Sequence, residues 1–311
     1  MNGAPSQITP LALPKAITST EGIHSEISRV FPASAAPGLP SSLLTLDCTP
    51  ITLPLEPLYI SLSTSYQVIL LPESASVNSD NPLGMFDTIV RGTRHTLDFA
   101  TACGARKLLF TSSGAVYGKQ PPDLGCIPES HACSLDPVDP LSAYGEGKRA
   151  AELLCSMVAR QHGLEVKIAR CFAFVGPWLP LGIHYAIGNF IGDALRGQPV
   201  HVRGDGTAWR SYLYAADLAI WLWKILFCGE SLHPYNVGSS EALCIRDIAQ
   251  MVASSVSPPL AVVVDKAPVP GNPAERYVPS TERARSELDL RPLVDLQSGI
   301  LKTIAWHRAR S

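Results

Sequence analysis

Apolar residues recur with two different periods along most of the chain. Leu83–Cys103 repeats them at helical spacing and ends at Gly104, while Lys107–Thr111 is a short apolar run typical of a buried strand. Ser142 precedes a second helical pattern that runs to His162, and we expect its side chain to cap this helix. Five further elements follow: a strand at Glu165–Arg170, helices at 184–196 and 215–228, a strand at Tyr235–Gly238 and a helix at 244–255. Alternating strands and helices predict the α/β class, with a parallel sheet covered on both faces.

The first part of the chain lacks this pattern. Residues 1–72 carry six charged side chains and ten of the 27 prolines. Proline interrupts a helix, and the first 57 residues, with nine prolines, show no defensible helical period. Two short apolar stretches, Leu58–Leu62 and Tyr66–Leu71, predict strands. We therefore expect an atypical Pro/Ser-rich segment over residues 1–72, followed by a regular α/β fold.

Composition and charge exclude several classes of function. The chain has 25 Lys and Arg against 27 Asp and Glu, so it has no basic field with which to hold nucleic acid or an anionic membrane. No apolar run reaches the roughly 20 residues that cross a bilayer, and no secretory signal is present in the first 30 residues. The eight cysteines show no CxxC or metal-ligand spacing, which predicts reduced thiols and no metal site. We expect a cytoplasmic enzyme.

Candidate chemistry concentrates around one tyrosine. Tyr144 and Lys148 are four residues apart, so on a helix they share a face, and an ammonium next to a phenol stabilises the phenolate that can act as a base. An isolated pair with this spacing is most often a surface pair. Here Ser113 follows the strand at Lys107–Thr111, at the strand end where open α/β sheets bind ligands. The three side chains together predict proton removal from a sugar hydroxyl while hydride leaves the same carbon.

Six motifs in order resemble a known family. They read FTSSGAVYG, SAYGEGKRAAE, IARCFAFVGP, GNFI, GDGTAWRSYLYAADLA and YNVGS. Over residues 80–305 the chain resembles the extended short-chain dehydrogenase/reductase group, and more narrowly the NAD-dependent nucleotide-sugar epimerase/dehydratase family. The resemblance implies NAD as cofactor, with NADP as the alternative, a nucleotide-sugar substrate, a role in carbohydrate metabolism, and a homodimer formed through a four-helix interface that includes the Tyr144 helix.

The resemblance also implies a domain organisation. We expect a Rossmann-type doubly wound parallel sheet with a smaller C-terminal substrate domain. Residues 73–180 would form the remainder of the NAD-binding domain after the atypical segment. Residues 181–311 would mainly bind the nucleotide sugar, with some segments returning to the Rossmann core. The first βαβ unit is expected to be degraded or missing.

Residue roles follow from the same resemblance. Tyr144 is similar to the catalytic base, Lys148 to the partner that also holds the nicotinamide ribose, and Ser113 to the hydroxyl that binds the substrate oxygen being oxidised. Four further residues resemble positions that contact the nucleotide sugar: Asn189, Arg210, Asn236 and Arg276. A guanidinium suits phosphate because its fork donates two hydrogen bonds at once. Asn236 also fits a residue that satisfies backbone groups at a strand end, and Arg276 fits a surface position equally well.

One departure from the family concerns the cofactor. Such families open with a glycine-rich turn, GxxGxxG, whose backbone approaches the pyrophosphate, and residues 1–80 contain only Gly3, Gly22 and Gly38. Either the cofactor half is missing, or sequence of another origin replaces it. A shifted reading frame would produce an amino-acid sequence of this kind, and the nucleotide sequence would then encode the glycine turn in another frame. A chain without the turn is expected to bind NAD poorly.

Two further departures bear on the reaction. Dehydratases of the family carry Asp-Glu directly after the catalytic hydroxyl, and the decarboxylases carry a Glu two places before the Tyr of VYG. At those positions this chain has Gly114-Ala115. Ala173 stands where the family usually has an Asn that contacts the sugar nucleotide. We therefore expect modification of a nucleotide sugar through a 4-keto intermediate, epimerase-like by preference. The alternatives are a dehydratase or decarboxylase, and a catalytically impaired relic that binds a nucleotide sugar without turnover.

Overall fold

The protein was analysed as a computed structural model, which describes residues 58–62, 66–70, 80–182 and 185–310. All of these lie in one compact unit, Leu46–Ser311. The helices and strands expected from the sequence in this range are present, and their ends differ from the expected ones by at most two residues. The expectation for residues 1–57 lies outside the described residues.

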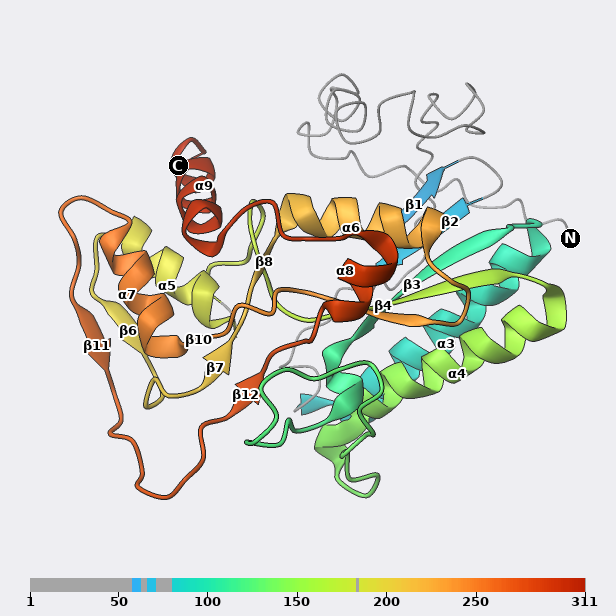
Figure 1. Ribbon diagram of the computed structural model, residues 1–311, viewed down its shortest axis with the longest axis horizontal. Coiled ribbons are helices and arrows are strands. Elements are labelled where there is room, and N and C mark those ends of the chain that lie inside the picture. The colour runs from blue at the N-terminus through green and yellow to red at the C-terminus, as the bar shows by residue number, and fades with distance from the viewer. Residues whose placement is uncertain (1–57, 63–65, 71–79, 183–184, 311) are drawn as a thin grey trace, which may run out of the picture. The chain divides into compact units, whose positions relative to one another are not determined.

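A five-stranded sheet forms the first part of the unit (Figure 1). Its order is β1 (Leu58–Leu62), β2 (Tyr66–Leu70), β3 (Lys107–Ser113), β4 (Glu165–Cys171) and β9 (Pro234–Val237). β2, β3, β4 and β9 run parallel, as expected for the α/β class. β1 differs, because it pairs antiparallel with β2. Only residues 63–65 separate these two strands, and a connection that short cannot make the crossover that a parallel pair needs.

Helices cover both faces of this sheet. α3 (Pro82–Ala102) and α4 (Ala143–His162) pack on one face, and α6 (Ala215–Cys228) packs on the other (Figure 1). Successive side chains of β3 point to opposite faces, so Leu108 and Phe110 join the cluster under α3 and α4, whereas Leu109 joins the one under α6. These clusters fix the carboxyl ends of the parallel strands against the first turns of the helices.

The second part of the unit holds shorter elements, most of which surround a core of their own. In chain order they are β5 (Phe174–Val175), α5 (Ala186–Leu195), β6 (Val200–Val202), β7 (Trp209–Arg210), β8 (Leu213–Tyr214), β10 (Leu243–Cys244), α7 (Ile245–Ser254), β11 (Val262–Val264), β12 (Arg276–Tyr277), α8 (Glu282–Leu288) and α9 (Leu296–Arg308). α5, α7 and α9 share one buried cluster with β6. α8 and α6 instead pack with the first sheet. β10, β7 and β12 form a three-stranded sheet in that order.

The expectation for the Ser142 cap is wrong. The backbone of Ser142 is already helical (φ −73°, ψ −8°), and its side chain makes no cap hydrogen bond. A short 3-10 helix, η4 (Pro140–Ser142), runs directly into α4 and takes over the start of the helix. Asp139 caps this segment, because its Oδ1 accepts a hydrogen bond from the Leu141 N–H at 2.9 Å.

Candidate active site

Ser113 ends β3 and is almost fully buried, with 7% of its surface exposed. Its Oγ accepts a hydrogen bond from the Ala115 N–H at 3.2 Å, and this bond caps the 3-10 helix η3 (Gly114–Tyr117). Cys171, at the end of β4, pairs with Ser113 across the sheet. Burial raises the pKa of Cys171 to about 12, against the opposing charge of Lys148, so this neighbour stays a neutral thiol.

Lys148 ties α4 to the end of β3. Its ammonium Nζ donates a hydrogen bond to the main-chain carbonyl oxygen of Thr111 at 3.2 Å, and only 2% of the residue is exposed. The Nζ atom also lies 5.8 Å from the ring centroid of Tyr144 and 5.5 Å from that of Phe110. A buried cation needs such partners to offset its lost hydration. The structure therefore brings Tyr144 and Lys148 together, one helical turn apart, as the sequence predicted.

Glycine at position 145 lets the start of α4 approach η3 closely. A Cβ on Gly145 would lie 2.8 Å from the Ala115 carbonyl oxygen and 2.6 Å from Leu135. Ala115 thus touches both halves of the predicted site, because its N–H binds Ser113 and its carbonyl lies against the residue that follows Tyr144. The start of the Tyr144 helix therefore lies against the segment that follows Ser113, at the carboxyl end of β3.

A second tyrosine, which sequence reasoning missed, reaches the end of β3 from the other part of the unit. The hydroxyl of Tyr277, on β12, lies beside Gly114, the residue after Ser113, because a Cβ on Gly114 would be 2.7 Å from Tyr277 Oη. Burial raises the pKa of Tyr277 to about 12, while the neighbouring Ser113 hydroxyl and the charge of Arg210 oppose this shift. The phenol is therefore neutral at physiological pH. Nothing in the AERYV segment marks this tyrosine, because Gly114 is distant from it in the sequence.

Gly114 and two aromatic rings fill the space next to Ser113. A Cβ on Gly114 would lie 2.6 Å from Cζ of Phe172 and 2.7 Å from Oη of Tyr277, closer than real Cβ contacts. The rings of Phe172 and Tyr277 pack with centroids 4.7 Å apart. No side chain fits at position 114 unless these rings move. Ser113 is thus followed by a position without a functional group.

The two predicted arginines lie on different faces of the small sheet. Arg210 pairs with Tyr277 between β7 and β12, and Trp209 pairs with Arg276. Laterally paired residues point to the same face, so Arg210 lies on the side of Tyr277 and Ser113. Arg276 stacks on the Trp209 ring, with its guanidinium carbon 4.9 Å from the centroid, on the opposite face. Arg210 also makes an ion pair with Glu275 at 3.2 Å.

The two predicted asparagines differ as well. Asn189, on α5, is half-buried and belongs to the second part of the unit. Asn236 is completely buried on β9. Its Nδ2 donates to the main-chain oxygens of Ile127 and Ser280, and its Oδ1 accepts from the Tyr117 hydroxyl at 2.8 Å. This arrangement satisfies backbone groups, the alternative that the sequence left open, and it does not bring Asn236 to Ser113.

A buried ionic network lies beneath the site. The guanidinium of Arg170 donates two hydrogen bonds to Glu152 on α4, at 3.0 and 2.7 Å, and a third to the Tyr117 hydroxyl at 2.9 Å. The hydroxyl of Ser112 donates to Glu152 at 2.6 Å. Burial pulls the pKa of Arg170 down, but its bonds to Glu152 outweigh this and raise the pKa above its usual value. The network fixes α4 against the ends of β3 and β4.

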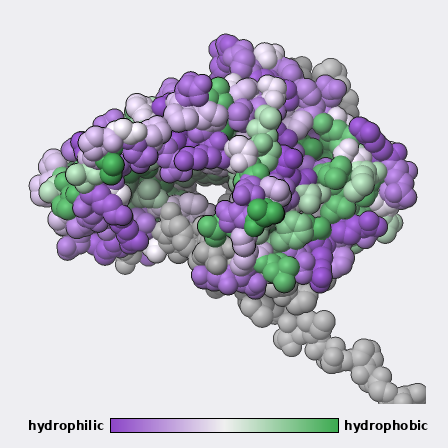
Figure 2. Space-filling model, turned by 90° about the horizontal axis from the view of Figure 1, so that it is seen from below, coloured by the Kyte–Doolittle hydropathy of each residue, from purple (hydrophilic) through white to green (hydrophobic). Residues whose placement is uncertain are grey.

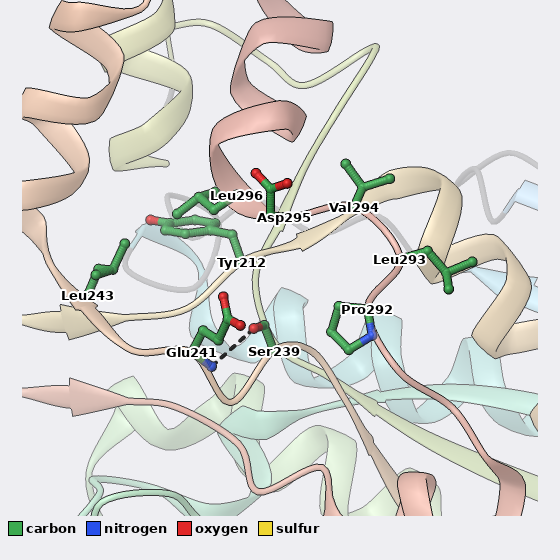
Figure 3. A pocket seen from close by; sticks show the side chains of 9 residues that line it. All are labelled: Tyr212, Ser239, Glu241, Leu243, Pro292, Leu293, Val294, Asp295 and Leu296. Atoms are coloured by element: carbon green, nitrogen blue, oxygen red, sulfur yellow. Dashed lines mark hydrogen bonds between the residues drawn. The ribbon is translucent and has the colours of Figure 1, made fainter.

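A small pocket opens elsewhere, between the loop after β9 and the segment before α9 (Figure 3). Tyr212, whose pKa burial raises to about 12, lines it together with carboxylates of Glu241 and Asp295. The Glu241 N–H donates to the Ser239 hydroxyl at its wall, at 3.1 Å. None of the predicted site residues lines this pocket, so it is separate from the Tyr144 site. Within the described residues, no group of three or more metal-ligating side chains occurs.

Comparison with known proteins assigns the family. The sequence model of the NAD dependent epimerase/dehydratase family matches residues 63–238, more than half of the chain. The chain belongs to this family. UDP-glucuronic acid decarboxylase 5 of Arabidopsis thaliana is 33% identical over 245 residues, which cover 79% of this chain and 70% of that protein. UDP-glucuronic acid decarboxylase 1 of Danio rerio is 32% identical over 251 residues, 81% of this chain and 58% of the relative.

Solved structures of family members share the fold of this epimerase/dehydratase-family chain. The UDP-glucose 4-epimerase of Thermus thermophilus, solved with NAD, is 28% identical with a TM-score of 0.66, and the match covers 78% of this chain and 76% of that one. The UDP-glucose 4-epimerase of Thermotoga maritima reaches a TM-score of 0.70 at 24% identity, covering 79% and 78% of the two chains. Both support the Rossmann-type fold class expected from the sequence.

The residues present fit one end of a dinucleotide. By the family resemblance, Tyr144 and the buried Lys148 would hold the nicotinamide ribose, and Lys148 contacts the carboxyl end of a parallel strand. At the other end, the whole sequence contains no GxxGxxG turn. In the described part of the sheet, antiparallel β1 occupies the edge next to β2. The chain therefore combines the Tyr144–Lys148 pair with a sequence that lacks the motif that usually holds the pyrophosphate.

Proposed function

We propose that this protein oxidises and re-reduces C4 of a nucleotide-linked hexose, an epimerase-type reaction through a 4-keto sugar. Tyr144, beside the Lys148 ammonium, takes the proton from the C4 hydroxyl, and the Ser113 hydroxyl donates a hydrogen bond to the same oxygen. Bound NAD supplies the hydride acceptor. The observation that carries the proposal is the close approach of α4 to η3 at Ala115, which holds the Tyr144–Lys148 pair at the strand end where Ser113 lies.

The preference for epimerisation rests on the two positions after Ser113. By the family resemblance, enzymes that catalyse elimination or decarboxylation carry acidic side chains at those positions. Here Gly114 is enclosed by Phe172 and Tyr277, and Ala115 carries only a methyl group. Without a further acid or base to promote elimination or decarboxylation, the route left to the 4-keto intermediate is return of the hydride.

Decarboxylation is the second candidate, and a specific observation favours it. The relatives at 33% and 32% identity are named as UDP-glucuronic acid decarboxylases. Loss of CO2 from a 4-keto glucuronate needs the same first oxidation at C4. Both candidates therefore share the roles proposed for Tyr144, Lys148 and Ser113.

For the nucleotide diphosphate we propose Arg210 as the principal cation. It lies on the sheet face that carries Tyr277. Its side chain is 23% exposed, so a ligand could reach it beside the ion pair with Glu275. Asn189, on α5, is proposed as a further contact. Asn236 has structural partners in the described residues, and the geometry gives it less support as a substrate contact. Arg276 stacks on Trp209, but its buried Nε has no hydrogen-bond partner among the described residues, so it stays proposed as a substrate contact.

We further propose that the protein is a homodimer in the cytoplasm. Leu153 and Met157, one turn apart on α4, are 60% and 49% exposed, and Leu83 on α3 is 73% exposed. Hydrophobic residues gather on the part of the molecule where α3 and α4 lie (Figure 2). Burial of this face against a second copy would remove apolar surface from water. The cysteines among the described residues are all free, which fits a reducing compartment.

The alternative of a relic without turnover is supported by the missing glycine turn. Product analysis separates the three possibilities. The full-length protein is incubated with added NAD and either UDP-glucose or UDP-glucuronic acid. Conversion of UDP-glucose to its C4 epimer supports the proposal, and CO2 release from UDP-glucuronic acid supports the second candidate. Binding of either nucleotide sugar without any product, at every NAD concentration, supports the relic.

In the parts of the chain that the structure describes, no helix combines the length and apolar character needed to span a bilayer.

A further inference from the structure

Arg276 has a guanidinium that the described residues satisfy only in part. Its Nε atom is buried and has no hydrogen-bond partner among them. An N–H without an acceptor costs free energy when it is buried, and the cost is higher for a charged group. The residue as a whole is only half-buried, so a ligand can approach the rest of the guanidinium. These features indicate an anionic partner from outside the chain, and the guanidinium fork suits a phosphate.

The Trp209 ring covers one face of this guanidinium. The two residues pair laterally between β7 and β12, and the guanidinium carbon of Arg276 lies 4.9 Å from the centroid of the ring. The Trp209 N–H also donates to the carbonyl of Glu275, the residue before Arg276, at 2.7 Å. Cation–π stacking of this kind fixes the plane of a guanidinium and leaves the N–H donors at its edge available.

The main-chain carbonyl of Gly125 lies at the edge of the same guanidinium. Nη2 of Arg276 donates to this oxygen at 3.4 Å, which is a long hydrogen bond. Gly125 belongs to the segment between η3 and η4, which has no helix or strand of its own among the described elements. The carbonyl can therefore fix the arginine only if another group holds this segment in place.

Gln120 holds it. Only 3% of this residue is exposed, and its Nε2 donates to the main-chain oxygens of Leu124 and Gly125, at 2.6 and 3.1 Å. Its Oε1 accepts from the Val278 N–H at 2.9 Å. One buried amide thus joins the Gly125 carbonyl to the backbone two residues after Arg276. Both N–H donors of the amide are used within the protein, so the side chain has none left for a ligand.

We propose that Gln120 and Trp209 are positioning residues, which hold the Arg276 guanidinium in the orientation that binds the diphosphate of the nucleotide sugar. This inference rests on the proposed function and adds two residues to its substrate site. Both act through Arg276, and neither takes part in the chemistry at C4. A donor that is already in place binds more tightly, because less conformational entropy is lost when the ligand arrives.

Binding of UDP to the full-length protein, measured by titration calorimetry, tests the inference without turnover or NAD. Arg276→Met should weaken UDP binding at least about 10-fold, the size of a hydrogen bond to a charged group. Gln120→Ala and Trp209→Leu should each weaken it about 3–10-fold, the cost of ordering one loosened side chain. In the Arg276→Met background, the same two changes should weaken it less than about 2-fold, because the group that they position is gone.

Two further measurements separate positioning from a general structural role. Trp209→Phe keeps an aromatic ring over the guanidinium, so it should bind UDP within about 2-fold of wild type. In assays with NAD and UDP-glucose, or UDP-glucuronic acid if only that is turned over, Gln120→Ala and Trp209→Leu should raise KM. Their kcat should stay within about 2-fold of wild type, because they weaken binding and leave the chemistry unchanged.

The matched controls lose the same kinds of side chain elsewhere. Gln297→Ala removes an amide whose Nε2 donates to Ser255 Oγ at 2.9 Å. Trp223→Leu removes a ring that stacks on Phe227, with centroids 5.6 Å apart. Both controls should bind UDP as wild type does.

Urea unfolding shows which variants are folded. Loss of the Gln120 amide leaves buried backbone groups unpaired, so Trp209→Leu carries the test if Gln120→Ala does not fold. Weakening that is equally large with and without Arg276, or no weakening at all, would overturn the inference and leave the proposed chemistry at C4 intact. The predicted pattern of UDP binding in a protein that turns over neither sugar would support the inference and contradict the proposed reaction. A folded wild type that binds no UDP would overturn both.

Discussion

The ammonium of Lys148 donates a hydrogen bond to the main-chain carbonyl of Thr111 at 3.2 Å, across the interface between α4 and β3. Thr111 is two residues before Ser113, so this bond sets the position of the Tyr144 helix relative to the serine hydroxyl. The lysine has two roles in this arrangement: it anchors the helix and brings a positive charge to the Tyr144 ring. A substitution that removes the charge therefore also removes an anchor.

Gly114→Ala should destabilise the fold. Its Cβ would lie within 2.7 Å of both Phe172 and Tyr277, and overpacking of this kind costs about 1–3 kcal/mol. Urea unfolding measures the change. The control is Gly125→Ala, where a Cβ meets nothing within 4 Å, and we expect the two variants to differ clearly. Equal stability of Gly114→Ala and wild type would show that the enclosure of Gly114 is not as described.

Arg170→Met should be strongly destabilising. It leaves the Glu152 carboxylate buried without its partner, which costs about 3–5 kcal/mol in other proteins. The free energy of unfolding in urea is the measurement. As a control, Arg285→Met breaks an exposed pair with Glu282, and exposed pairs contribute about 0–1 kcal/mol. Similar losses in both variants would contradict the structural role of the Arg170–Glu152 pair.

Acid should weaken the fold in part through Glu165. The hydrogen bond from Lys167 lowers the pKa of this carboxyl below its usual value. The pKa of Glu165 is lower in the folded state than in the unfolded state. The stabilisation that its carboxylate provides is therefore complete above the unfolded pKa, about 4.3, and is lost as pH falls through the folded pKa. Urea midpoints measured from neutral to acidic pH should fall less steeply for Glu165→Gln than for wild type. A Glu241→Gln variant, which removes a carboxylate elsewhere, is the control, and identical profiles for Glu165→Gln and wild type would refute the prediction.

Charges on the exposed face of α4 should dissociate the proposed dimer. Leu153→Glu and Met157→Glu each place a carboxylate on this face, where a partner copy would have to bury it. Sedimentation velocity should show a dimer for wild type and a monomer for the double variant. Val269→Glu, at a valine that is 64% exposed elsewhere, should remain dimeric. A wild type that sediments as a monomer at every concentration would rule out the dimer.

Local patterns predicted most of the fold, and tertiary contacts account for what they missed. The spacing of Tyr144 and Lys148 is a property of one helix, so it could be found from the sequence. The approach of Tyr277 to Gly114 could not, because β12 is only two residues long and Gly114 is distant from it in the sequence. Asn236 shows the opposite case, since an asparagine at a strand end looks the same in sequence whether it binds a ligand or, as here, the backbone.

Strand pairing also separated residues that the sequence grouped together. Arg210 and Arg276 both resembled positions that contact the nucleotide sugar, but the register of β7 and β12 puts them on opposite faces of a sheet. The antiparallel pairing of β1 with β2 likewise follows from a short connection, which the apolar pattern of each strand does not record.

Transient NADH formation tests the central claim most directly. NAD-loaded protein is mixed with UDP-glucose or UDP-glucuronic acid, and NADH absorbance and sugar products are followed for wild type and Tyr144→Phe, with Tyr235→Phe as the control. We predict NADH and product with wild type and the control, and a rate at least about 10²–10⁴-fold lower in a folded Tyr144→Phe, because the base is lost. Turnover by Tyr144→Phe at the wild-type rate would contradict the account.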